Sequence, residues 1–327
     1  MGIYYDLNKL LSHNKILNFV IGPRGGGKSF AAKKWAINGW LKNRKEFIYL
    51  RRYNTELLEI GNWFSDISSF YPEHEFAVEG GHFFIDGEVA GYYIALSTSQ
   101  QKKSVSYPNV NKIIFDEFII DKGRVTYLKE EVQMFLDFYE TVARLREDVT
   151  ALLIANAITV VNPYFTYFHI YPKSNSKFIT KSEVCVEIYR NDDFMAKKKN
   201  TKFGRLIDGT RYGKYAIENE FYRDNMNFIE KMTGQTTPWC SIIYMGKRFG
   251  VWYGIETGFI YFNKKIPPDN RPVFALTTSD HEPNYLLIKK YSQNQRFKDI
   301  KLCYEMGTVR FDCLESKQVF YEFMQLI

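Results

Sequence analysis

The residues with the clearest chemistry are residues 22–29 (GPRGGGKS), which fit the phosphate-binding pattern G-x-x-x-x-G-K-[ST] at every fixed position. Glycines let such a loop wrap closely around phosphates with its N–H groups pointing inward. We expect Lys28 to contact the β- and γ-phosphates of ATP and the Ser29 hydroxyl to ligate Mg²⁺. A glycine-rich turn without a ligand is the alternative. The residues expected to bind the nucleotide are Gly22, Arg24, Gly25, Gly26, Gly27, Lys28 and Ser29.

Two acids follow a second apolar run, in residues 113–117 (IIFDE). At the carboxyl end of a parallel strand, Asp116 would lie beside the phosphates and hold Mg²⁺. Glu117 would then be placed to polarise the attacking water as a general base. An exposed acidic turn is the alternative, but the phosphate loop upstream favours the metal site. The acid pair favours hydrolysis over phosphoryl transfer to a second substrate.

Five further polar side chains have roles that the sequence leaves open. Arg144 and Arg146 end a predicted helix, where either could stabilise transition-state charge at a neighbouring subunit or simply complement the helix dipole. Asn156 ends a predicted strand and could sense the γ-phosphate or cap a turn. Arg24 could contact phosphate, a neighbouring subunit or solvent. Lys103 lies in a polar stretch and reads as a solvated lysine.

Strand and helix patterns alternate through the first half of the chain, which predicts an α/β layered domain with a mainly parallel sheet. This domain is expected to end near residue 195. Strands are predicted at residues 16–21, 46–51, 112–115 and 150–155, helices at 29–41 and 130–146, and a hairpin at 83–96 around the dipeptide at 86–87 (DG).

The second half has the pattern of a smaller α+β domain. Residues 197–202 (KKKNTK) begin the best linker candidate, and this charged run reads as a solvated surface. Short strands are predicted at 240–244, 250–253, 258–262, 273–276 and 309–311, with helices at 284–306 and 315–325. This order is compatible with a ribonuclease-H-like fold and with other folds.

A ribonuclease-H-type nuclease needs clustered carboxylates that hold two metal ions. The first predicted strand of the meander, residues 240–244 (CSIIY), carries none. Asp312 is a single candidate ligand, and Asp280 reads as a helix cap. We therefore expect no nuclease activity. Lys247 and Arg248, in a predicted hairpin, could contact DNA phosphate or serve solubility.

Composition adds weaker constraints. The formal net charge of +7 fits a polyanionic partner without identifying it. The four cysteines form no C-x-x-C pair, which argues against a zinc site or a disulfide framework and for a reducing, cytosolic setting. No apolar run approaches the ~20 residues that span a bilayer, so we expect no membrane association.

Taken together, these residues resemble the DNA-packaging motor ATPases of phi-29-like podophages. The matching segments run in the same order and spread over roughly two thirds of the chain. They are residues 16–29 (ILNFVIGPRGGGKS), 47–53 (FIYLRRY), 107–110 (YPNV), 113–118 (IIFDEF), 156–165 (NAITVVNPYF) and 201–210 (TKFGRLIDGT).

The resemblance implies an ASCE-type P-loop ATPase domain at residues 1–195, a linker at 196–225, and a ribonuclease-H-like nucleic-acid-binding domain without nuclease activity at 226–327. It implies a homo-oligomeric ring, a pentamer, at the procapsid portal in the host cytoplasm, associated with a structural RNA and absent from the mature virion. Such a ring drives double-stranded DNA into the procapsid. The resemblance assigns trans-acting roles to Arg144 and Lys103, while Arg146 matches another family arginine.

Three other function classes use the same motifs. Another P-loop translocase or helicase would also respond to DNA. A small-molecule kinase would need a phosphate acceptor and ignore DNA. A nucleotide-gated assembly protein would bind ATP yet tolerate Glu117→Gln.

Overall fold

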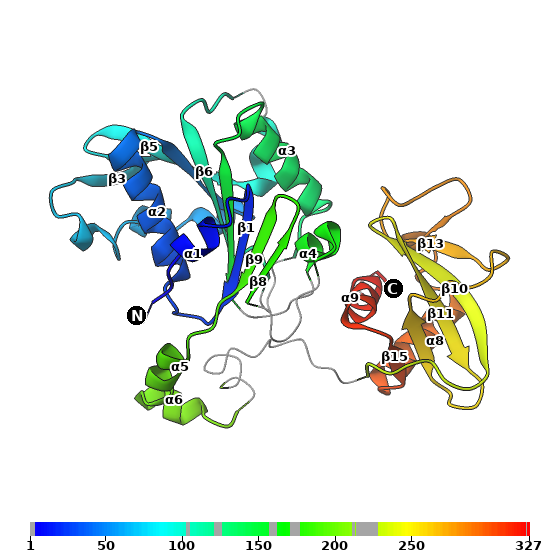
Figure 1. Ribbon diagram of the computed structural model, residues 1–327. Helices are drawn as coiled ribbons and strands as arrows, with labels where there is room; N and C mark the ends of the chain where they lie inside the picture. The colour runs from blue at the N-terminus through cyan, green and yellow to red at the C-terminus, as the bar shows by residue number, and fades with distance from the viewer. Residues whose placement is uncertain are drawn as a thin grey trace. The chain divides into compact units, whose positions relative to one another are not determined.

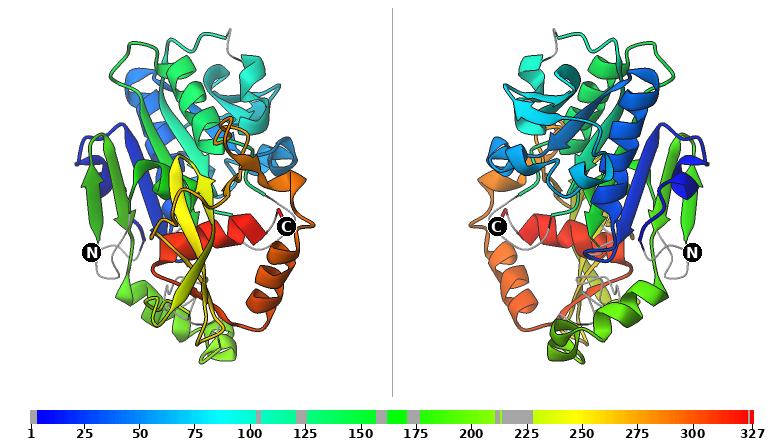
Figure 2. Two further views of the ribbon diagram at one scale, coloured as in Figure 1. Left: turned by 90° about the vertical axis from the view of Figure 1, so that its right-hand side faces the viewer. Right: turned by 90° about the vertical axis from the view of Figure 1, so that its left-hand side faces the viewer.

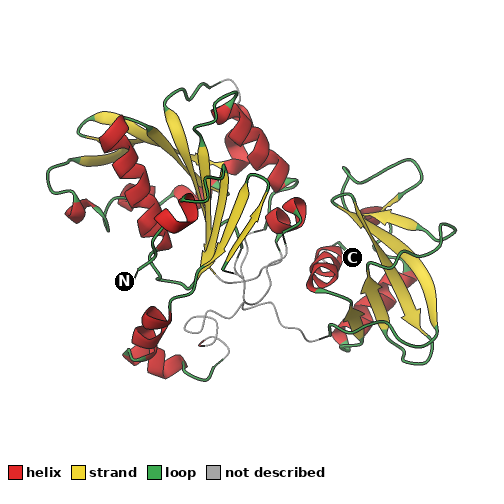
Figure 3. Cartoon of the chain, in the orientation of Figure 1, coloured by secondary structure: helices red, strands yellow, loops and turns green. Residues whose placement is uncertain are grey.

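The computed structural model describes residues 4–102, 105–120, 126–156, 162–170, 177–210, 213, 228–324 and 326–327. Contacts divide the chain into two compact units. Met1–Tyr164 with Phe168–Arg223 form the N-terminal unit, and Asp224–Ile327 with Phe165–Tyr167 form the C-terminal unit. Each unit has its own sheet (Figure 3). Each also has its own apolar core.

A nine-stranded sheet forms the centre of the N-terminal unit, in the order β3-β4-β5-β2-β6-β7-β1-β9-β8 (Figure 1). The strands from β5 to β9 in this order are parallel, and β3, β4 and β8 add antiparallel edges. Strand β7 lies between β1 and β6, as the ASCE assignment requires. The strands are β1 Leu17–Gly22, β2 Glu46–Arg51, β3 Phe76–Glu79, β4 His82–Ile85, β5 Glu88–Ala95, β6 Val110–Asp116, β7 Thr150–Asn156, β8 Phe178–Lys181 and β9 Val184–Ile188.

Helices cover both faces of this sheet, which explains why β1 is buried along its whole length. Val20 packs into the core beneath α2, on one face. Phe19 points to the opposite face, where Phe115 stacks on Phe135 of α3 at 5.9 Å between ring centroids. Figure 1 shows α2 and α3 on opposite sides of the sheet. The helices are α1 Asn8–Leu11, α2 Lys28–Asn43, α3 Glu131–Ala143, α4 Pro163–Phe168, α5 Asp192–Lys199 and α6 Lys202–Ile207, with short 3-10 turns η1 Asn54–Leu57, η2 Ile60–Asn62, η3 Ser68–Phe70 and η4 Leu96–Lys102.

The predicted strands, helices and hairpin of the first half are confirmed, with shifted ends. The helix expected over 130–146 ends at Ala143, because Arg144 adopts φ 51 and ψ −118, which no helix can continue. Strands β3, β8 and β9 and helix α4 were not predicted. Helix α5 and helix α6 occupy residues 192–199 and 202–207, so part of the segment expected as a linker is helical. Residues 211–212 and 214–225 of that segment lie outside the described ranges.

The C-terminal unit has a six-stranded sheet in the order β14-β13-β10-β11-β12-β15. Strands β10, β11 and β12 form an antiparallel meander, and β13 and β14 continue parallel to β10. When β10 to β14 are numbered 1 to 5 along the chain and the sheet is followed from β12 to β14, their order is 3-2-1-4-5. This is the strand order of ribonuclease-H-like sheets, the predicted fold class of this domain. The elements are β10 Thr236–Tyr244, β11 Lys247–Gly254, β12 Ile260–Asn263, β13 Val273–Ala275, β14 Leu286–Leu287, η5 Ile288–Lys290, α8 Gln295–Glu305, β15 Val309–Phe311 and α9 Leu314–Met324.

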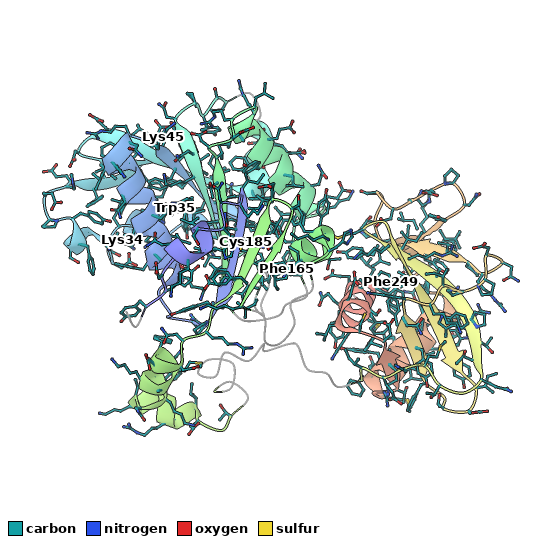
Figure 4. All side chains as sticks on the ribbon, viewed as in Figure 1. Lys34, Trp35, Lys45, Phe165, Cys185 and Phe249 are labelled. Carbon is teal, nitrogen blue, oxygen red and sulfur yellow. The ribbon has the colours of Figure 1, made fainter. Side chains whose placement is uncertain are left out.

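Aromatic side chains fill the core of the C-terminal unit between the sheet and its two helices, α8 and α9, drawn in orange and red in Figure 2. Phe249, labelled in Figure 4, stacks on Phe262 at 5.7 Å, and Phe262 meets Phe320 of α9 at 5.5 Å. This packing uses part of the chain's high aromatic content.

The helix predicted over residues 284–306 is wrong in its first half. Leu286–Leu287 pair with β13 as strand β14, and the helix begins only at Gln295. Asn294 caps it, because its side-chain oxygen accepts a hydrogen bond from the Arg296 N–H at 2.9 Å. Within the described ranges, no helix has both the length and the apolar character needed to cross a bilayer.

Candidate nucleotide site

Strands β1, β7 and β6 end at the same edge of the N-terminal sheet, and their register brings the predicted site residues together. Gly22 at the end of β1 pairs with Asn156 at the end of β7. Asp116 at the end of β6 pairs with Ile154, just before Asn156. Ligands of open parallel sheets bind at this carboxyl edge.

The glycine-rich loop between β1 and α2 requires glycine at two positions. Gly25 has φ 82 and Gly27 has φ 88, in the left-handed region that disfavours other residues. Gly27 is also the N-cap of α2, so the free N–H groups and the positive end of the helix dipole face the loop. Tyr5 fixes the loop from outside by donating its N–H to the Gly26 carbonyl at 3.0 Å.

Lys28 is buried beneath this loop. Its Nζ donates hydrogen bonds to the carbonyls of Gly22 at 3.0 Å and Pro23 at 2.8 Å, and to Asn156 Oδ1 at 3.4 Å. Burial lowers the pKa of Lys28 to about 7, and the nearby carboxylate of Asp116 acts in the opposite direction. The ammonium therefore lies where phosphate oxygens would replace its present carbonyl partners.

Asp116 is held in place by two donors. The Tyr49 hydroxyl donates to Asp116 Oδ2 at 3.2 Å, and the Glu117 N–H donates to Asp116 Oδ1 at 3.0 Å. Burial, followed by the charge of Asp116, raises the pKa of Tyr49, so this phenol stays a donor. Asp116 and Ser29 line the same cavity, and their carboxylate and hydroxyl oxygens are the donor types that Mg²⁺ prefers.

Glu117 follows Asp116 with a left-handed backbone, φ 59. Its side chain is 56% exposed, and its Oε2 lies 2.7 Å from the Nη2 of Arg51. Arg51, at the end of β2, also pairs with Glu56 at 3.0 Å. Arg51 therefore engages one oxygen of the carboxylate, while much of the side chain stays accessible to water.

A buried ion pair fixes the backbone that follows Glu117. Arg52 and Glu131 are each 1% exposed in their side chains and are joined by Nε–Oε2 and Nη2–Oε1 contacts of 2.7 and 2.9 Å. The same guanidinium donates to the carbonyls of Glu117 at 3.2 Å and Phe118 at 2.8 Å. The Tyr164 hydroxyl completes the cluster by donating to Glu131 at 3.0 Å.

These supporting residues were missed by the sequence analysis. Two adjacent arginines at the carboxyl end of β2 were a usable signal, because β2 and β6 pair in register and end together. Their partners gave no such signal. Glu56 is distant in sequence from the acid pair, a loop separates Glu131 from it, and neither glutamate belongs to a recognisable motif.

The two arginine candidates have different surroundings. Arg146 donates to the carbonyls of Tyr107, Pro108 and Val142 at 2.7–3.0 Å, so its guanidinium ties the end of α3 to the segment before β6. Arg144 is exposed, and the structure gives its guanidinium no hydrogen bond or ion pair to any other described residue. Lys103 lies outside the described residues.

The glycine loop and the ends of β6 and β7 line one cavity of about 690 Å³. This volume lies in the usual range for small-molecule sites. Of the residues predicted from the sequence, it is lined by Arg24, Gly25, Gly26, Gly27, Lys28, Ser29, Asp116, Glu117 and Asn156.

The carboxylates considered for a nuclease site have structural partners in the C-terminal unit. Asp280 accepts the N–H groups of Met245 and Gly246 at the hairpin turn, at 3.1 and 2.8 Å. Asp312 accepts the Lys264 N–H at 3.0 Å and the Ser316 hydroxyl. No three metal-binding side chains come together within the described ranges.

Lys247 and Arg248, the two basic residues of the predicted hairpin, begin β11 rather than forming its tip. Lys247 pairs with the buried Glu315, and Arg248 pairs with Asp269 at 3.4 Å. A structural role therefore accounts for both, and their contact with DNA stays a prediction.

Comparison with known proteins identifies the family. The family described as "Podovirus DNA encapsidation protein (Gp16)" matches residues 1–327. The chain belongs to the podovirus DNA encapsidation family. The DNA packaging protein of Bacillus phage phi29 is 40% identical over 321 residues, which cover 98% of this chain and 97% of that protein.

Solved structures agree with this assignment. A chain of the bacteriophage phi-29 viral genome packaging motor assembly matches with a TM-score of 0.78 at 40% identity, covering 99% of both chains. The crystal structure of the N-terminal domain of the DNA packaging ATPase from bacteriophage phi29 matches at 44% identity and a TM-score of 0.56, covering 59% of this chain and all of that one. The comparisons therefore confirm the prediction of a phage DNA-packaging ATPase that uses a nucleotide.

Proposed function

We propose that the chain hydrolyses Mg·ATP in the cavity at the carboxyl edge of its N-terminal sheet and thereby drives double-stranded DNA into a procapsid. The observation that carries this proposal is the convergence of Lys28, Asp116 and Asn156, from three elements, on one cavity. A glycine loop at a helix N-terminus supplies the anion site, and the acid pair supplies the metal ligand and the base.

Each residue then has a role in binding or hydrolysis. The N–H groups of the glycine loop hold the phosphates, and Lys28 neutralises the β- and γ-phosphates. Ser29 and Asp116 would hold Mg²⁺, which neutralises phosphate charge when bound. Glu117 accepts a proton from the attacking water. Asn156 lies beside Lys28 and would sense the γ-phosphate.

Arg144 supplies positive charge to the transition state at a neighbouring subunit. Its exposure supports this role, whereas the guanidinium of Arg146 is engaged within its own chain. Lys103 would be a second trans-acting residue, and Arg24, exposed in the loop, a phosphate contact. Positioned arginines of this kind accelerate phosphoryl transfer by roughly 10³–10⁵-fold.

The likeness to a chain of the phi-29 packaging motor assembly supports the assembly we propose. Five copies would form a ring at the portal of the procapsid in the host cytoplasm, associated with a structural RNA and absent from the mature virion. Residues 1–195 would be the ATPase domain, 196–225 the linker, and 226–327 a nucleic-acid-binding domain without nuclease activity.

The test is the ATPase rate measured against added double-stranded DNA for the wild type, Glu117→Gln and Arg144→Ala, alone and mixed. Each variant alone should lose the DNA-stimulated rate, because every interface lacks one group. Mixing the two variants should restore part of the rate, since some interfaces regain both groups. Mixtures as inactive as the separate variants would contradict catalysis in trans.

The ATPase assay tests for a kinase, and a DNA packaging assay tests for an assembly protein. A rate that depends on a small-molecule phosphate acceptor and not on DNA would indicate a kinase. Packaging that survives Glu117→Gln would indicate a nucleotide-gated assembly role without hydrolysis.

A further inference from the structure

The nucleotide cavity has an aromatic side that phosphate chemistry does not explain. Tyr4, Phe30 and Phe70 line it together with the glycine loop. Phe30 and Phe70 meet edge to face, with ring centroids 5.1 Å apart at 68°. Phe30 is half-buried against the core, but Tyr4 and Phe70 are 65% and 62% exposed. Two large rings that face a cavity and leave most of their surface in water have apolar area free for a ligand.

The position of these rings relative to the loop shows which part of a nucleotide they would meet. Phe30 follows Ser29 in the first turn of α2, and the Tyr4 Cβ lies 3.1 Å from where a Cβ on Gly27 would be. The acid pair lies at the end of β6, where the terminal phosphate and its water react. A triphosphate with its reacting end at the acids and its chain along the glycines leaves its nucleoside beside the first turn of α2.

We propose that Tyr4 and Phe70 form a stacking site for the purine base of the nucleotide, with Phe30 as its floor. The proposal deepens the function given above and rests on it, because it assigns the base end of the same ligand. Stacking uses the face of the base, so it favours purines, whose two fused rings offer more area than a pyrimidine.

The experiment compares two ligands that share the phosphate chain and differ in the base. Mg·ATP and Mg·tripolyphosphate are titrated by calorimetry into the full-length wild type, Phe70→Ala, Tyr4→Ala and Phe70→Trp. Tyr291→Ala, which removes a partly exposed aromatic outside the cavity, is the matched control. Lys28→Ala reports on the phosphate site itself.

Phe70→Ala and Tyr4→Ala should each weaken ATP binding by about tenfold, within the range of base–aromatic stacking, and leave tripolyphosphate binding within twofold of the wild type. Phe70→Trp and Tyr291→Ala should keep ATP affinity. Unchanged ATP affinity in both alanine variants, or an equal loss for both ligands, would overturn the stacking site. Failure of Lys28→Ala to weaken either ligand would instead overturn the phosphate site and the proposed function.

Discussion

Glu117 and Arg144, the proposed base and the proposed trans-acting arginine, both have a positive φ angle, which is unfavourable for residues other than glycine. Their φ angles are 59 and 51, in a region that costs an ordinary residue roughly 1–2 kcal/mol. Glycine would avoid this cost at either position. Each position therefore carries its charged side chain at a backbone cost, which is compatible with the chemical role proposed for it.

Arg144→Gly should therefore stabilise the fold while it removes function. We expect its free energy of unfolding to rise by about 1 kcal/mol, because glycine relieves the strained φ, ψ pair. DNA-stimulated hydrolysis should fall to the level of Arg144→Ala. Urea denaturation and the ATPase assay measure the two effects separately.

The matched control is Ser182→Gly, at φ 49 in the turn between β8 and β9, far from the acid pair in sequence. It should gain stability and keep its ATPase rate. If Arg144→Gly retained the wild-type rate, the assignment of Arg144 to catalysis would be wrong.

Lys28 makes nucleotide binding dependent on pH. With its pKa lowered to about 7 by burial, the free protein carries mostly neutral Lys28 at pH 8. Phosphates favour the charged amine, so binding at pH 8 should take up close to one proton. ATP affinity should fall as pH rises above 7, by up to tenfold per pH unit. Calorimetry at pH 8 in two buffers of different ionisation enthalpy counts the protons.

Lys28→Arg is the control for this titration, because a guanidinium stays protonated across the range. Its affinity for ATP should be lower at pH 7, because the larger, planar guanidinium does not fit the space that the lysine ammonium occupies. Proton uptake on ATP binding should disappear. Uptake that persists in Lys28→Arg would assign the titration to another group.

At the scale of elements, the Arg52–Glu131 pair joins the end of β2, the turn after β6 and the start of α3. Removing one member, as in Glu131→Ala, leaves a buried charge without its partner. Such changes cost about 3–5 kcal/mol. We expect a loss of this size in urea denaturation, with a loss of hydrolysis because the turn that carries Glu117 is no longer fixed.

An exposed pair in the same unit provides the comparison. Lys45, labelled in Figure 4, lies 3.2 Å from Asp148 with both side chains more than a third exposed. Lys45→Ala should cost less than about 1 kcal/mol and leave hydrolysis unchanged. Equal losses for Lys45→Ala and Glu131→Ala would mean that the buried pair has no special role.

The sequence was sufficient for elements with a strong local signal. The glycine loop fixed the junction of β1 and α2, and continuous apolar runs predicted β2, β6 and β7. Strand β14 was missed because Leu286 and Leu287 are too few to show a period, and only pairing with β13 makes them a strand. Arg52 and Glu131 were missed because two charged residues far apart in sequence give no sign of meeting in the interior.

At the scale of the whole molecule, the formal net charge of +7 fits a polyanionic partner such as DNA. If contact is with phosphates rather than bases, the stimulation of ATP hydrolysis by double-stranded DNA should require more DNA as salt rises. The logarithm of the half-maximal DNA concentration should increase linearly with the logarithm of salt concentration. Hydrolysis without DNA should change much less over the same range.

Duplexes of different sequence should give the same curve. A strong preference for one sequence, or half-maximal stimulation independent of salt, would contradict recognition of the DNA backbone.

The N–H of Tyr5 holds the Gly26 carbonyl, and the Tyr5 hydroxyl donates to Glu187 on β9 at 2.8 Å. Tyr5 thereby connects the glycine loop to β9. Strand β9 is the neighbour of β1 in the sheet, and β1 leads into the glycine loop. A displacement of β9 would therefore reach the proposed phosphate site twice, through the strand pairing and through Tyr5.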